Sequence, residues 1–151
     1  MAYNLFAVIG RAHDVAGLDH PQLLGRVDLV EGYALRPLDV DWLEEESEVH
    51  PRQFDDVVTL IGDAMIAASA GHPIAYVAIE TFGGSLEVNG AAVWSEGAIV
   101  HRDLVEGETA EGRTVLPCEE ALALIGVVAM AGHDAFDTLG LGRYRSTEEW
   151  R

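Results

Sequence analysis

One carboxylate stands where acid–base chemistry is plausible on physical grounds. Glu80 ends a short apolar run that begins at Ile74, just before the glycines Gly83 and Gly84. A carboxylate at the end of a buried strand can act as a general base, bind a ligand or anchor an arginine, and anchoring an arginine is the favoured interpretation.

A histidine beside Glu80 would change that interpretation. With His72 or His101 as its partner, Glu80 would supply the acid–base pair of a small hydrolase or transferase. No motif in the sequence requires this pairing. An enzyme is therefore the alternative function rather than the first one.

The other nucleophilic and metal-binding residue types form no motif. Cys118 is the single cysteine, and it stands near the expected start of a helix, where a thiol pKa can fall. It lacks a flanking catalytic signature, so an inert thiol is favoured. The six histidines show neither an HExxH motif nor helical i, i+4 pairing. The sequence predicts no metal and no cofactor.

The densest cluster of charge is the segment from Asp39 to Glu48, in which six of ten residues are acidic. Tryptophan is a residue type that often dominates the energy of a protein interface, and one lies inside this segment. The alternative is a solvated acidic turn whose tryptophan packs into the core. The residues expected to bind a basic protein partner are Asp39, Asp41, Trp42, Glu44, Glu45, Glu46 and Glu48.

The charge of the whole chain favours a cationic partner. Its 151 residues include 26 acidic and 9 basic side chains, and the net charge is -17. Such a charge destabilises a compact domain by self-repulsion, and fast capture of a basic partner is one reason to retain it. Solubility or adaptation to high salt is another. The shortage of cations argues against direct binding of nucleic acid.

Length and hydropathy indicate a single domain over residues 1–151. The longest mostly apolar stretch, around Leu122 to Ala131, is about half the length of a membrane span. The first ten residues lack the basic region of a signal peptide. We therefore expect a cytoplasmic protein that does not associate with a membrane.

Hydrophobic periodicity predicts the elements of the first half of the chain. Apolar residues spaced i, i+3, i+4, i+7 predict one long amphipathic helix, about 52–70. Residues 10–21 are punctuated by glycine and proline and predict a loop. Strands are expected at Tyr3 to Ile9, Leu23 to Val30 and Tyr33 to Leu38, the last two forming a hairpin across Glu31 and Gly32.

The second half predicts a strand meander followed by short helices. The expected strands are Ile74 to Thr81, Glu87 to Trp94 and Ala98 to Arg102. Helices are expected from Pro117 onward and over His133 to Gly140. The tail should dock by packing and pairing among its own residues: Arg143, Tyr144, Arg145, Glu148, Glu149, Trp150 and Arg151.

Together these elements predict an α+β fold. The expected architecture is a mostly antiparallel sheet, with the long helix and the shorter C-terminal helices packed on one face. The apolar edge of the meander could pair with a second copy, which makes a homodimer the structural alternative.

The C-terminal half resembles a known class of bacterial protein. The segments that carry this resemblance are Tyr76 to Trp94, Leu124 to Val127 and Asp134 to Trp150. They are similar to small uncharacterised bacterial proteins of the toxin-immunity type. The resemblance implies a protein-binding function with a toxin as the partner. It assigns no catalytic or binding residue.

Overall fold

An antiparallel sheet of six strands forms the centre of the computed structural model, which describes residues 2–18, 20–107 and 112–150. The order of the strands across the sheet is β2-β3-β1-β4-β5-β6. Their bounds are β1 Ala2–Arg11, β2 Val27–Asp28, β3 Tyr33–Pro37, β4 Ile74–Phe82, β5 Ser85–Ser95 and β6 Ala98–Glu106.

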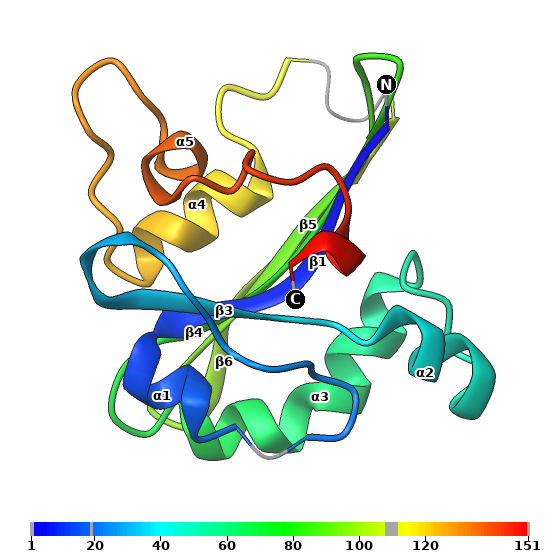
Figure 1. Cartoon of the computed structure of the whole chain (residues 1–151). Coiled ribbons are helices and arrows are strands. Elements are labelled where there is room, and N and C mark those ends of the chain that lie inside the picture. Colours follow the sequence, from blue (N-terminus) through cyan, green and yellow to red (C-terminus); the bar gives the residue numbers. More distant parts are fainter. Residues whose placement is uncertain (1, 19, 108–111, 151) are drawn as a thin grey trace.

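Helices cover both faces of this sheet (Figure 1). The longest, α3, packs on one face, and α4 and α5 pack on the other. Helical elements in the described residues are α1 Ala12–Ala16, η1 Val30–Gly32, α2 Val40–Glu46, α3 Phe54–Ala68, α4 Pro117–Leu124, α5 Ala135–Leu139 and η3 Thr147–Glu149. The predicted α+β class, the antiparallel sheet and the long helix are confirmed.

The expectation that helices would cover one face only is wrong. In the central strand β1, Leu5 and Ile9 belong to the apolar cluster under α4 and α5, whereas Phe6 and Val8 belong to the cluster under α3. Successive side chains of a strand point to opposite faces, so the continuous apolar run from Leu5 to Ile9 needs cover on both.

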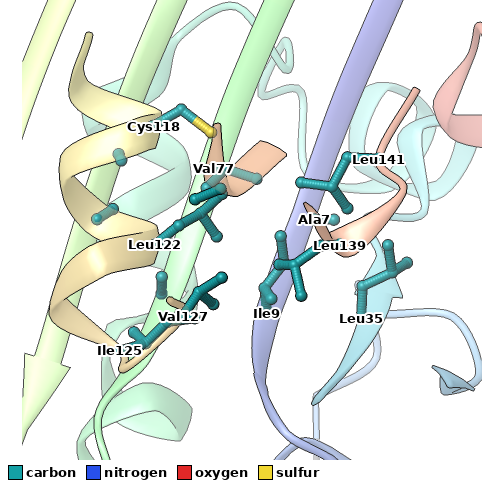
Figure 2. Close-up of a cluster of buried hydrophobic side chains, with 14 of the residues drawn as sticks. Ala7, Ile9, Leu35, Val77, Cys118, Leu122, Ile125, Val127, Leu139 and Leu141 are labelled. Carbon is teal, nitrogen blue, oxygen red and sulfur yellow. The ribbon is translucent and has the colours of Figure 1, made fainter. Parts of the chain in front are cut away.

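The cluster on the α4 side is drawn in Figure 2. Leu122 and Ile125 of the α4 segment face Ala7, Ile9 and other apolar side chains of the sheet. Leu139 and Leu141 close the cluster from the α5 segment. The short C-terminal helices are therefore held by the core rather than by their own length.

Two local expectations differ from the structure, and a third segment departs from the alternative considered for it. Within residues 10–21, the segment Ala12–Ala16 forms the short helix α1 rather than a loop. Of the strand expected over Leu23 to Val30, only Val27–Asp28 pairs with β3. The acidic segment after Asp39, for which a solvated turn was the alternative, is mostly helical, as α2. All three are short elements, for which neighbouring packing outweighs local sequence preference.

The turn between β4 and β5 is formed by two glycines. Gly83 and Gly84 have φ angles of 59° and 81°, in the left-handed region that glycine adopts without strain. The predicted long helix begins two residues later than expected, at Phe54, with Asp55 and Asp56 in its first turn. In the first turn of α3, the carboxylates of Asp55 and Asp56 interact favourably with the helix dipole.

Across the described ranges, no helix combines the length and the apolar character needed to cross a bilayer.

Candidate protein interface

The acidic segment is shaped by helix α2. The side chain of Asp39 caps the helix by accepting a hydrogen bond from the backbone N–H of Trp42 at 3.1 Å. Leu43 is fully buried in the apolar cluster under α3 and fixes the helix to the body of the protein. One cap and one buried side chain therefore determine which residues of α2 face solvent.

The expected partner-binding residues are mostly on that solvent face. Trp42 is half-buried, and neither apolar cluster includes it. Leu43 takes the core position instead, so the indole is not sunk in the interior. The carboxylates that are exposed are those of Asp41, Glu44, Glu45, Glu46 and Glu48, and Asp39 is half-buried as the cap.

Most of these carboxylates have no cation beside them. Glu44 lies 3.6 Å from Nε2 of His50. Among the described residues, no arginine or histidine lies within ion-pair distance of the other four exposed carboxylates, Asp41, Glu45, Glu46 and Glu48. Elsewhere arginines pair with acids, as Arg102 does with Asp55 and Arg113 with Asp103. The negative charge of α2 is therefore not neutralised within this part of the molecule.

A groove of about 430 Å³ separates α2 from η3, and we call it the α2–η3 groove. It brings together segments that are far apart in the sequence: the start of β1, the loop before α3, the end of β4 and the segment at η3. Its lining residues are Asn4, Phe6, Val40, Glu44, His50, Pro51, Arg52, Glu80, Ser146, Thr147 and Glu148.

The wall of the groove at η3 is fixed to β1 by a hydrogen-bond network. Oδ1 of Asn4 accepts from both the backbone N–H and the hydroxyl of Thr147, at 2.9 and 2.7 Å. The hydroxyl oxygen of Thr147 also accepts from the backbone N–H of Phe6 at 3.0 Å. Because Thr147 is buried, this wall is part of the folded core and not a loose tail.

Glu80 anchors an arginine, which is the interpretation favoured from the sequence. Both of its carboxylate oxygens accept from the guanidinium of Arg52, with Nε 3.1 Å from Oε2. The side chain of Glu80 is only 16% exposed, whereas that of Arg52 is 58% exposed. The pair is thus a bidentate contact at the floor of the groove.

The structure brings neither histidine of the alternative acid–base pair to Glu80. His72 precedes the start of β4, whereas Glu80 is near its end, and Nδ1 of His72 lies 2.9 Å from Oδ2 of Asp14. His101 is opposite Val93 on the α4 side of the sheet, 3.9 Å from Glu120, whereas Glu80 is opposite Val88 on the α3 side. Glu80 therefore has a cation and not a proton carrier as its partner.

Cys118 is fully buried at the first turn of α4, with its sulfur directed toward the sheet (Figure 2). Burial raises the pKa of its thiol far above the ordinary value. The thiol is therefore protonated at neutral pH and is not a nucleophile. In the described parts of the chain, no three histidine, cysteine or carboxylate side chains gather closely enough to hold a metal ion.

The ring packing expected in the C-terminal tail is present. The ring of Tyr144 meets that of Trp150 edge-on at 4.9 Å, and the guanidinium of Arg143 lies 5.8 Å from the Trp150 ring centroid. Trp150 is buried in the cluster under α4. Arg151 lies outside the described residues.

The sequence singled out Glu80 and Glu148 in other roles, but it did not indicate that they or the remaining groove residues would lie beside the acidic segment. Asn4, Arg52, Thr147 and Glu148 are separated by up to 144 positions from one another, and no local pattern relates them.

Comparison of this chain with protein-family models, with curated proteins and with solved structures finds no match.

Proposed function

We propose that this chain is a protein-binding domain that uses its acidic α2 surface to capture a basic protein partner and to neutralise or regulate it. The observation that supports the proposal most is the set of exposed carboxylates on α2 that have no cation beside them in the described residues. The half-exposed Trp42 among them offers an aromatic anchor of the kind that stabilises interfaces.

Electrostatics gives such a surface a kinetic advantage. A positively charged partner is steered toward a negative face, and this raises association rates above the roughly 10⁵–10⁶ M⁻¹s⁻¹ of uncharged pairs. The net charge of -17 extends the attraction beyond the contact itself. Because salt screens the attraction, the association rate should fall as ionic strength rises.

The resemblance of the C-terminal half to toxin-immunity proteins suggests a bacterial toxin as the basic partner. In this proposal the protein acts in the cytoplasm, as expected from the sequence, and fractionation of the native host tests that location. The hydrolase or transferase alternative has lost its main support, since Arg52 and not a histidine binds Glu80.

A second copy of the chain is a less favoured partner. The edge strand β6 exposes Ile99 and Val100, which could support pairing. However, its register with β5 is irregular at this end of the strand, and it carries the charged Arg102. Irregular register and charge are features that oppose edge-to-edge association.

The test compares two variants with the same change in net charge. In the first, Glu44→Lys, Glu45→Lys and Glu46→Lys reverse the α2 surface. In the second, Asp63→Lys, Glu96→Lys and Asp137→Lys reverse three exposed carboxylates in α3, the β5–β6 turn and α5. The wild-type chain is used to capture a partner from host lysate at low salt, and association rates of the purified partner are then measured.

We expect the α2 variant to associate about tenfold more slowly than wild type, and the control variant to change far less. Equal slowing of both variants would show that net charge acts without a defined surface. No change in the rate or in its salt dependence for the α2 variant would contradict the proposal.

A further inference from the structure

The α2–η3 groove has the chemistry of a site for a long cationic side chain. Its carboxylates are Glu44 on α2, Glu148 on η3 and Glu80 on the floor. Among the residues that the structure describes, Glu80 is the only one of the three with an arginine bound to it. Glu44 has His50 at 3.6 Å, a contact that is charged only when the imidazole is protonated. The groove thus retains a net negative charge with Arg52 in place.

The apolar residues of the groove suit the aliphatic stem of a long cationic side chain. Val40, which is half-buried, lines the groove together with those carboxylates, and the buried Phe6 and Pro51 lie beneath its surface. The aliphatic stem of a lysine or arginine packs on apolar surface while its head reaches polar groups. A purely acidic surface offers no place for the stem, and a purely apolar pocket offers none for the charge.

A second hollow of about 430 Å³ adjoins the groove and shares Asn4, Arg52 and Glu80 with it. It extends toward the β4–β5 turn, where Phe82 is 68% exposed and Glu87 is exposed. The two hollows together offer room for more than one residue of a partner along the end of the sheet.

From these observations we propose that the α2–η3 groove receives an arginine or lysine side chain of an extended basic segment of the partner. The cationic head lies between Glu44 and Glu148, and the segment continues past the Arg52–Glu80 pair toward Phe82. This inference rests on the proposed function, because it names the part of the basic partner that the acidic surface recognises.

The test uses a defined probe, a short peptide with three consecutive arginines, and the same peptide with citrulline at those positions. Citrulline keeps the shape of arginine and removes its charge. Binding to the full-length ¹⁵N-labelled chain is followed by amide chemical shifts at low salt. The groove variant is Glu44→Gln with Glu148→Gln, and the matched control is Glu45→Gln with Glu46→Gln on the same surface.

We expect shifts centred on the amides of Phe6, Val40 and Thr147, and none with the citrulline peptide. The groove variant should bind the arginine peptide about fivefold more weakly than wild type, since each lost exposed ion pair weakens binding modestly. The control variant should bind within about twofold of wild type. All four substitutions are at exposed positions, so both variants should fold.

The outcomes that overturn the inference are separate from those that overturn the proposed function. Shifts confined to the outer side of α2, with equal weakening in both double variants, would reject the groove and leave the acidic surface standing. So would failure of the peptide to bind when the captured partner still depends on Glu44, Glu45 and Glu46. If neither peptide nor partner depends on any of these residues, both proposals fail.

Discussion

The hydroxyl of Tyr76 is a buried polar group without a partner among the described residues. The ring is fully buried and stacks on Phe54 with their centroids 6.0 Å apart. By contrast, the hydroxyl of Tyr3 donates to the carbonyl oxygen of Leu141 at 2.8 Å. An unpaired buried hydroxyl loses its bonds to water on folding and gains nothing in exchange.

Tyr76→Phe should therefore raise the free energy of unfolding by about 1 kcal/mol, because it removes only the unpaired hydroxyl. Tyr3→Phe removes a hydroxyl that does donate a hydrogen bond, and it should lower the free energy of unfolding by about 1 kcal/mol. Urea denaturation of the two variants and the wild type measures both changes. A loss of stability in Tyr76→Phe would mean that its hydroxyl has a partner after all.

Single residues also show the limit of prediction from sequence. The place of Glu80 at the end of a buried strand, and its role as an anchor for an arginine, could both be anticipated. Which arginine it binds could not, because Arg52 is 28 positions away and reaches Glu80 only through the packing of α3 on the sheet. The same holds for the contact of Asn4 with Thr147.

At the scale of elements, one carboxylate joins two helices. Both oxygens of Glu119, in the first turn of α4, accept backbone N–H bonds from Ala135 and Phe136 of α5 at 2.9 Å. These two N–H groups at the start of α5 lack hydrogen-bond partners within their own helix, and the carboxylate of Glu119 accepts from both. Its negative charge also interacts favourably with the positive end of the helix dipole. Glu119 therefore holds the five-residue α5 in place.

Glu119→Ala should lower the free energy of unfolding by about 2 kcal/mol, as loss of a charged cap with two bonds does. Hydrogen exchange should speed up most at the amides of Ala135 and Phe136. The matched control is Glu120→Ala, which removes the adjacent, half-exposed carboxylate and should change stability far less. Equal losses in the two variants would show that the effect comes from α4 alone.

Element boundaries could be predicted where a pattern was long. The apolar face of α3 repeats over 15 residues and identified the helix, whereas α2 has seven residues and a single buried one, Leu43. A single buried position among acidic residues is too short a hydrophobic pattern to identify a helix.

The wrong expectation about which faces of the sheet are covered has a different cause. The unbroken apolar run of β1 already required cover on both sides, and the order of elements along the chain did not reveal where that cover would come from.

At the scale of the whole molecule, charge opposes compactness. The acidic side chains are not confined to α2: they also occur in α3, β6 and α4. Surface ion pairs such as Arg102–Asp55 offset little of this repulsion, because an exposed pair typically contributes about 0–1 kcal/mol. With a net charge of -17, repulsion among the carboxylates should outweigh the attraction within these few pairs.

Salt should therefore stabilise this protein. Raising ionic strength from about 0.01 M to about 0.15 M shortens the screening length from about 30 to about 8 Å, which weakens repulsion across the molecule more than contacts within a pair. We expect the melting temperature to rise by about 3 °C, which corresponds to about 1 kcal/mol for a chain of this size. The variant with Asp63→Lys, Glu96→Lys and Asp137→Lys carries less net charge and should show a smaller rise. A melting temperature that falls with salt in the wild type would mean that the ion pairs, and not the repulsion, dominate the electrostatic free energy of the fold.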